Sequence, residues 1–275
     1  MATLTTRPKE GNMNVLNFLR KPQRTGERIS RQALVALLAV GLTEAAIAQS
    51  STEAACRAQS GATVPAIVEL YTSEGCNSCP PADRWLASMV RNTPANVIAL
   101  AFHVDYWDYI GWKDVYAKPA YGERHRKLVL ASGSTTVYTP QVFVNGRDDR
   151  SWHIGTVPRA SLAARANLAI ESDWSPNRVK LRGRVAEARE PLRIRYALTE
   201  NSITTAVKAG ENKGELLTHD AVVREHAFIA VDASGAFDAD IILPARLARA
   251  RSQLHVIAET RSGEAVAAVS LRCAG

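Results

Sequence analysis

Cys76 and Cys79 are the residues of this 275-residue sequence whose type and spacing most clearly permit chemistry. Two residues separate the thiols, so the pair can close a disulfide within one turn and cycle between thiol and disulfide. A β-prone segment, 66–71, precedes them and a helix-prone segment, 82–91, follows. The positive end of a helix dipole favours a thiolate at its N-terminus. A zinc ribbon uses the same spacing but needs four ligands, and the sequence has no second C-x-x-C motif.

Thr139 and Pro140 directly precede a short apolar segment, 141–144, that is predicted to be a strand. Proline cannot donate to a strand ladder and therefore fits the start of a strand. A cis bond before Pro140 would turn the backbone of Thr139 toward the cysteines, where its polar groups could bind a peptide. We therefore expect a substrate platform at Thr139 and Pro140, with a simple strand-entry proline as the alternative.

Three further titratable residues lie in or just after the two strands expected nearest the cysteines. His103 and Asp105 follow the apolar segment 97–102, and Glu69 lies within segment 66–71. Ligands gather outside the carboxyl ends of strands in open α/β sheets. His103 and Asp105 could transfer protons there, anchor a loop, or contribute His103 to a metal site with the two thiols. Glu69 could assist proton transfer from a buried position.

Cys56 and Cys273 stand near the two ends of the sequence that remains after a predicted leader. In an oxidising compartment two remaining cysteines most simply pair with each other. Such a bridge would stabilise the fold by on the order of 4–5 kcal/mol in the chain-entropy model. A free thiol or an intermolecular link is the alternative.

The N-terminal segment 1–48 has the organisation of a secretory signal peptide, with an uncleaved anchor or a disordered tail that holds a chance apolar patch as the alternatives. It holds seven Lys and Arg residues, an apolar run at 33–42 and an A-x-A site, and the predicted cut follows Ala48. Much of the net charge of +7 therefore lies in the leader, so we expect no nucleic-acid partner. No apolar run reaches the roughly 20 residues of a membrane-spanning helix. We predict a periplasmic or secreted protein without stable membrane insertion after cleavage.

The remaining sequence predicts two domains, at 62–173 and 174–275, with one α+β domain that carries a β extension as the alternative. The first alternates in the order β-α-β-α-β-β-α, which predicts an α/β domain with a mixed sheet. Its predicted helices are 82–91, 118–131 and 158–170, and Asn145-Gly146 is a hairpin signal. The second segment holds six or seven short alternating runs, which predict a small antiparallel β-sandwich.

The order of elements in 62–173 resembles the thioredoxin fold. More specifically, segments 69–83, 101–114 and 138–141 resemble a family of secreted thioredoxin-like bacterial proteins catalogued as domain of unknown function 1223, and segments 210–212 and 222–224 also look familial. The resemblance implies a fold and a cysteine pair, and supplies no substrate. Ordinary thioredoxins carry Trp before the first Cys and Gly-Pro between the two, where this sequence has Gly75 and Asn77-Ser78. Reduction, oxidation and isomerisation all stay open.

The leading hypothesis is thiol–disulfide exchange with protein thiols or disulfides of the cell envelope, without a cofactor. Cys76 would attack and Cys79 would resolve the mixed disulfide. One alternative is a metal-binding protein that holds a soft ion such as Cu(I) with Cys76, Cys79 and His103. The other is a binding module whose cysteine pair is too buried or too stably oxidised to react.

Overall fold

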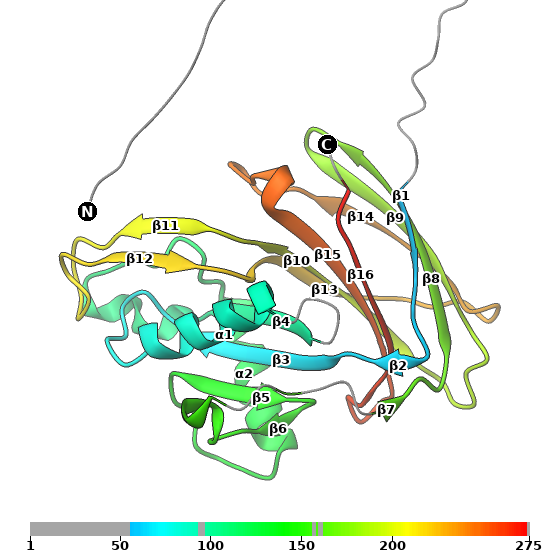
Figure 1. Ribbon diagram of the computed structural model, residues 1–275, viewed down its shortest axis with the longest axis horizontal. Coiled ribbons are helices and arrows are strands. Elements are labelled where there is room, and N and C mark those ends of the chain that lie inside the picture. Colours follow the sequence, from blue (N-terminus) through cyan, green and yellow to red (C-terminus); the bar gives the residue numbers. More distant parts are fainter. Residues whose placement is uncertain (1–55, 93–96, 156–157, 159–161, 274–275) are drawn as a thin grey trace, which may run out of the picture. The chain divides into compact units, whose positions relative to one another are not determined.

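The structure is a computed structural model that describes residues 56–92, 97–155, 158 and 162–273 (Figure 1). The predicted signal peptide, 1–48, lies outside the described residues. In these ranges no helix is both long and apolar enough to cross a membrane.

An eight-stranded mixed sheet forms the centre of the fold. Its strand order is β16-β15-β10-β13-β4-β3-β5-β6. The strands are β3 (Ala66–Thr72), β4 (Val97–His103), β5 (Gln141–Val144), β6 (Arg147–Asp148), β10 (Arg193–Glu200), β13 (Val222–Ile229), β15 (Ser252–Glu259) and β16 (Ala265–Leu271). Every residue of β3 and β4 is buried, as expected of strands covered on both faces.

The two halves of the sequence meet in this sheet at β4 and β13. These strands are parallel, with Val222 in register with Ala101, and the Ala101 amide donates to the Ala221 carbonyl at 2.8 Å. On the other side of β4 lies β3, also parallel, and β5 then pairs with β3 in the antiparallel direction. Strands from the first and second predicted segments therefore share one hydrogen-bonded sheet.

Two helices and a second sheet cover the two faces. Helix α1 (Pro80–Asn92) packs on β3 and β4 through a cluster that includes Leu86 and Met89. Helix α2 (Pro119–Ala131) covers the opposite face, where Phe102 and Tyr121 are in contact. The second sheet has the order β1-β8-β9-β14 and packs on β10, β15 and β16. Its strands are β1 (Cys56–Gln59), β8 (Asn167–Ser175), β9 (Arg178–Ala186) and β14 (Ala236–Ile242).

Short elements complete the fold. The 3-10 helices η1 (Asp105–Ile110), η2 (Trp152–Ile154) and η3 (Arg249–Arg251) lie in connections. Strands β11 (Ile203–Ala206) and β12 (Leu216–His219) form a hairpin, and β2 (Thr63–Val64) pairs with β7 (Leu162–Ala163). Figure 1 shows the β11–β12 hairpin beside α1, where the two elements are in contact.

The predicted fold class, an α/β thioredoxin-like domain followed by a separate antiparallel sandwich, is wrong. The protein is mostly β-sheet, and its large sheet runs through both predicted domains. The physical reason is that β13, from the second predicted domain, pairs with β4. In an independent α/β domain, β4 would pair only with strands of that domain. The predicted boundary between residues 173 and 174 falls inside β8.

The predicted final helix, 158–170, is also wrong where the structure describes it. This segment contains β7 and the first half of β8. In β8 the buried positions alternate strictly, with Leu168, Ile170 and Trp174 among those facing the core. The alanine content favours a helix locally. The structure is a strand because every second side chain of β8 is buried against the large sheet.

Candidate functional site

The candidate site lies at one edge of the large sheet, where three strands position its residues. Thr72 ends β3 and is in register with His103, which ends β4. Gln141 begins β5 and pairs with Tyr71, so the segment entering β5 arrives at the same edge. Because β3 and β4 are parallel, the segments that follow them emerge side by side. The sheet thus brings the cysteine loop, η1 and the Thr139-Pro140 segment together.

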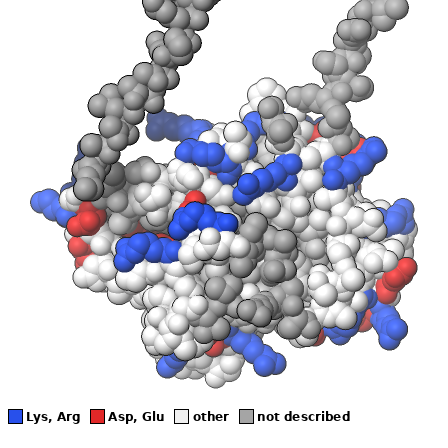
Figure 2. All heavy atoms as spheres, in the orientation of Figure 1, with Lys and Arg blue, Asp and Glu red and all other residues white. Residues whose placement is uncertain are grey.

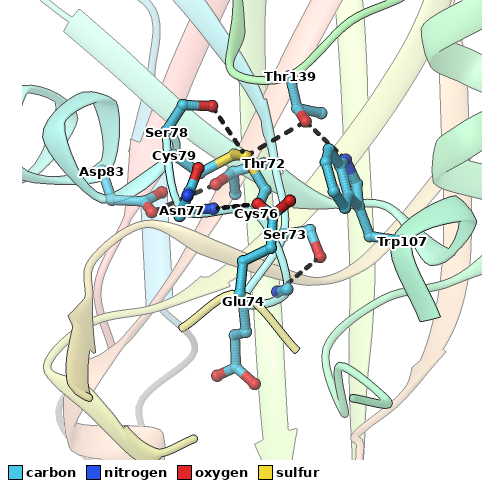
Figure 3. The surroundings of a disulfide bond; sticks show 12 residues. Thr72, Ser73, Glu74, Cys76, Asn77, Ser78, Cys79, Asp83, Trp107 and Thr139 are labelled. Carbon is cyan, nitrogen blue, oxygen red and sulfur yellow. Dashed lines mark hydrogen bonds between the residues drawn. A yellow bond between two sulfur atoms is a disulfide. The ribbon is translucent and has the colours of Figure 1, made fainter. Parts of the chain in front are cut away.

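Cys76 and Cys79 form a disulfide immediately before α1 (Figure 3). Two hydroxyls contact the Cys76 Sγ: Ser78 Oγ at 3.3 Å and Thr139 Oγ1 at 3.4 Å. Thr139 in turn accepts a hydrogen bond of 2.7 Å from the Trp107 indole. Pro80 and Pro81 have no backbone N–H, so the first two residues of α1 offer no amide donor.

The peptide bond between Thr139 and Pro140 is cis. The Thr139 hydroxyl is 3.4 Å from the Cys76 Sγ, so the residues expected to form a substrate platform do lie against the cysteine pair.

Both cysteines are completely buried, whereas Asn77 and Ser78 between them are exposed. A thiolate that approaches from solvent therefore contacts Asn77 and Ser78 before it can reach the sulfur of Cys76 or Cys79. Any attack on Cys76 therefore requires the side chains that cover it to move.

A buried acid, Asp83, lies in the first turn of α1 beneath the disulfide. Its Oδ2 accepts a hydrogen bond of 3.2 Å from the Thr72 hydroxyl, and Figure 3 shows the carboxyl directed toward Thr72. Burial raises the pKa of Asp83, and the positive charges of His219 and His103 oppose this rise only in part. Asp83 thus holds a proton more readily than an exposed aspartate.

His103 is fully buried and pairs with Asp114, not with Asp105. The His103 Nδ1 and the Asp114 Oδ2 are 2.7 Å apart. Burial alone would lower the pKa of His103, but the charge and hydrogen bond of Asp114, helped by Asp83 and Glu74, raise it to about 9. His103 is therefore a buried cation at neutral pH.

Glu74 and His219 extend this buried group toward the cysteine loop. His219 Nε2 lies 3.3 Å from Glu74 Oε1, and the His103 and His219 rings meet edge to face with centroids 5.0 Å apart. The Glu74 amide donates to Asp114, and Trp112 donates to the Glu74 carboxylate at 2.9 Å. We call Glu74, Asp83, His103, Asp114 and His219 the acid–histidine cluster.

The β11–β12 loop, residues 207–215, clasps the cysteine loop from the second half of the chain. Asn212 is buried and donates to the carbonyl oxygens of Glu74 and Cys76 at 2.8 and 3.0 Å. The Asn77 amide donates to Glu211 at 3.0 Å. Gly210 has a φ of +73°, and a Cβ there would lie 3.0 Å from the Ile110 side chain, so glycine allows the close approach.

Asp105 and Glu69 lie away from the arrangement expected for them. Asp105 faces α2, where its Oδ1 approaches the backbone of Gly122. Glu69 is buried and binds Arg124 at 2.6 Å and Arg195 at 3.0 Å. Burial would raise the pKa of Glu69, but the two arginines lower it to about 2. A carboxylate held ionised in this way has no proton to transfer at neutral pH, so we assign Glu69 to a structural ion cluster.

The described residues contain no group of three or more His, Cys, Asp or Glu side chains arranged to hold a metal ion. His103 gives its Nδ1 to Asp114, and both cysteine sulfurs are in a disulfide. A disulfide has no thiolate to offer to a soft ion. The metal set considered from the sequence is thus not assembled in this state.

An open cavity of about 540 Å³ adjoins the exposed side of the cysteine loop. Its lining combines aromatic, proline and hydroxyl side chains with one arginine: Ser78, Thr136, Tyr138, Pro140, Arg150 and Trp152. Arg150 lies over the Tyr138 ring at 5.7 Å. The cavity therefore joins the cysteine loop to the cis-proline segment.

The second disulfide joins Cys56 in β1 to Cys273 after β16. It bridges a sequence separation of 217 residues, and both of its residues are partly exposed. The Ser172 hydroxyl lies 3.5 Å from the Cys273 Sγ and accepts a hydrogen bond from Trp174.

These features define a mixed-sheet protein with a buried C-x-x-C disulfide at the sheet edge. The chain belongs to the family described as protein of unknown function (DUF1223), whose model matches residues 67–259. No curated protein matches the sequence.

Two solved structures are similar to the chain. HBP35 of Porphyromonas gingivalis is 12% identical with a TM-score of 0.53, and the match covers 77% of this chain and 76% of that one. At this identity the likeness concerns the fold alone. A protein of Agrobacterium tumefaciens, solved by crystallography as a structural genomics target, is 26% identical with a TM-score of 0.49 and coverage of 76% and 94%.

Several residues around the disulfide were not identified as site residues from the sequence. Asp83 lies in the first turn of a helix, where acidic residues are common, so its place in the sequence provides no reason to single it out. Asn212 and His219 lie more than a hundred positions from the cysteines, and Asp114 lies beyond η1. Segment 210–212 carried a family resemblance but no role.

Proposed function

We propose that the protein carries out thiol–disulfide exchange with protein partners through Cys76 and Cys79. The observation that carries this proposal is the setting of the Cys76 sulfur, which has two hydroxyl donors within 3.4 Å and stands before the N-terminus of a 13-residue helix. Hydroxyl donors and a helix N-terminus stabilise a thiolate more than a disulfide, because only the thiolate carries charge.

The exchange starts when a partner thiolate attacks the Cys76 Sγ. The Cys76–Cys79 bond breaks, a mixed disulfide forms, and Cys79 leaves as a thiolate that takes up a proton. A second partner thiolate then attacks the partner sulfur of the mixed disulfide and releases Cys76. Overall, two electrons and two protons pass from the partner dithiol to the cysteine pair. The same steps run in reverse when the partner disulfide has the higher reduction potential.

Asp83 is the proton donor in this proposal. It lies in the turn that follows Cys79, and burial raises its pKa. A carboxyl group with a raised pKa takes up and returns a proton more readily than an ordinary one, so Asp83 can deliver a proton to the thiolate that leaves. Thr139 positions the partner chain and holds its own hydroxyl against Cys76 through the hydrogen bond from Trp107.

The partners we propose are thiols or disulfides of proteins in the periplasm or outside the cell. The cavity beside Ser78 and Pro140 offers apolar and aromatic surface for the chain around a partner cysteine. The pairing of all four cysteines suits an oxidising compartment, as does the signal peptide predicted from the sequence.

The burial of both cysteines favours a second candidate, a binding module whose C-x-x-C disulfide is structural. A disulfide with no exposed sulfur resists exchange, because attack needs a direct approach along the S–S axis. In that case the Asn212 clasp and the acid–histidine cluster would serve stability alone.

The reduction potential of the Cys76–Cys79 pair separates the two candidates. The protein is equilibrated in glutathione or dithiothreitol buffers, and its thiols are alkylated and located by peptide mass. Exchange predicts a reversible potential of about −120 to −270 mV, the range of exchange proteins. A potential below about −300 mV, or a pair that never reacts while the protein is folded, supports the structural module instead.

Trapping of partners adds a direct test of the order of attack. Cys79→Ser should accumulate mixed disulfides through Cys76, because the resolving thiol is missing. Cys76→Ser should accumulate none. If Cys76→Ser retains exchange activity, the assignment of Cys76 as the attacked sulfur is wrong.

A further inference from the structure

A second cavity of about 540 Å³ is lined by arginines that belong to separate parts of the chain. Arg224 comes from β13, Arg251 from η3, and Arg246 from the connection between β14 and β15. A cavity of this size is within the range of roughly 300–1,000 Å³ for small-molecule sites. Tyr116, Ser202 and Thr204 add hydroxyl groups to the lining.

One buried carboxylate, Glu200, organises two of these arginines. It forms an ion pair with Arg224 and lies 3.4 Å from Arg251, which also donates to the Ser202 carbonyl at 2.7 Å. Arg224 is further held over the Tyr116 ring at 5.2 Å. Each guanidinium has five N–H donors in a fixed plane, so Glu200 leaves most of them unused.

Arg246 adds a charge that the described residues do not neutralise. It is exposed, and no ion pair to it occurs within the ranges that the structure describes. Three guanidinium groups and one carboxylate therefore leave a net charge of about +2 at the cavity, because arginine stays charged at all relevant pH values. The neighbouring Lys118 and Glu225 pair with each other at 2.6 Å and add no net charge.

The wider surface is consistent with this charge. In Figure 2, Lys and Arg side chains predominate over Asp and Glu in the region of β11, β12 and η3. Arg246, Arg249 and Arg251 form a basic cluster in the sequence, and the sequence alone favours a solvated edge there. The structure distinguishes among them, because Arg246 and Arg251 line the cavity whereas Arg249 packs over the Trp174 ring at 5.6 Å.

We infer that this cavity is a binding site for a small dianion, a phosphate monoester or a dicarboxylate. Planar guanidinium groups match the paired oxygens of both kinds of anion, and hydrogen bonds between them are charge-assisted. The inferred charge of the ligand matches the net charge of the lining. The site is separate from the Cys76–Cys79 disulfide, so this inference does not depend on thiol exchange.

Isothermal titration of the protein with inorganic phosphate and, separately, with succinate tests the site. We expect saturable binding of one ligand per chain by at least one of the two, and the stronger one identifies phosphate or carboxylate chemistry. Chloride at the same ionic strength should not compete. Absence of saturable binding for both anions, or equal competition by chloride, would overturn the inference.

Substitution of Arg246 locates the binding. Arg246→Gln should weaken the affinity by about tenfold or more, the usual effect of losing a charge-assisted hydrogen bond. Arg261→Gln is the matched control, since Arg261 is also an exposed arginine in a turn but does not line the cavity. Equal losses in both variants would indicate diffuse attraction and overturn the site. Arg251→Gln provides a second variant, with thermal unfolding as a check on the fold.

Discussion

The two disulfides of this protein stand in opposite settings. Cys76–Cys79 closes a loop with a sequence separation of 3, is fully buried, and is surrounded by hydroxyls and titratable groups. Cys56–Cys273 spans a separation of 217 and is partly exposed beside the edge of two sheets. The more exposed disulfide is therefore the terminal bridge, whereas the exchange that we propose takes place at the buried C-x-x-C pair.

Accessibility and chemical surroundings are therefore separate properties of these two disulfides. A short loop constrains the unfolded chain little, so the C-x-x-C bond contributes little to stability through chain entropy. The long loop constrains it strongly. The Cys76 sulfur is instead contacted by two hydroxyls, which would stabilise a thiolate if the bond opened.

Removal of each disulfide should give the largest contrast. Cys56→Ser/Cys273→Ser is expected to lower the free energy of unfolding by about 5 kcal/mol, and Cys76→Ser/Cys79→Ser by about 2 kcal/mol, because the entropic effect grows with loop length. Urea unfolding of the oxidised proteins measures both. Equal losses would show that the C-x-x-C bond stabilises mainly through native packing and would weaken the contrast.

Two buried histidines, His103 and His255, are expected to affect the unfolding free energy differently at alkaline pH. His103 binds its proton more tightly when folded, with a pKa of about 9, than when unfolded, near 6.5. Its stabilisation is therefore complete below about pH 6.5 and is lost as the pH rises to about 9, a change on the order of 3 kcal/mol. Urea unfolding of the oxidised protein between pH 7 and 10 measures it.

Two variants isolate this effect. His103→Gln/Asp114→Asn replaces the pair with neutral groups and should remove the alkaline loss. His255→Gln is the control, because burial, with the charges of Arg272 and Arg195, lowers the pKa of His255 to about 3 and leaves it neutral throughout this range. An alkaline loss that persists in the double variant would assign it to other groups.

Replacement of Asp83 should slow the reaction at one disulfide only. Asp83→Asn keeps the hydrogen bond from Thr72 but cannot donate a carboxylic proton, so exchange at Cys76–Cys79 is expected to slow about 10- to 100-fold at pH 7. Stopped-flow reduction with thiol reagents, followed by peptide mass, measures each bond separately. Asp149→Asn, on the loop after β6, is the matched control. Equal slowing of Cys56–Cys273 would contradict a local role for Asp83.

The sequence predicts the local elements of the site but not how distant strands join. The strand at 141–144 and the helix within 119–131 agree with their patterns, because each buries a regular face. No local sequence pattern predicts that β13 pairs with β4, because β-strand propensity does not specify which strand is the partner. The single large sheet was therefore beyond prediction from these runs.

The same limit applies to the residues of the site. Cys76, Cys79, Thr139 and Pro140 were selected because their types and spacing carry chemical meaning by themselves. The partner of His103 was sought two residues away in Asp105, whereas η1 intervenes and delivers Asp114. Asn212 reaches the site only through the β11–β12 loop, whose position depends on the whole fold.

Loss of the Asn212 clasp should give a smaller effect that still separates the two disulfides. Asn212→Ala removes donors from the buried carbonyls of Glu74 and Cys76 and is expected to cost about 1–3 kcal/mol of unfolding free energy. Because the clasp holds the loop that covers Cys76, reduction of Cys76–Cys79 should become faster by up to the factor that this free energy corresponds to, about 5- to 150-fold. Cys56–Cys273 should react as before.

Asn167→Ala, at an exposed position of β8, provides the control. If the variant loses stability but both bonds keep their rates, the clasp stabilises the fold without governing access, and the C-x-x-C pair opens by another route.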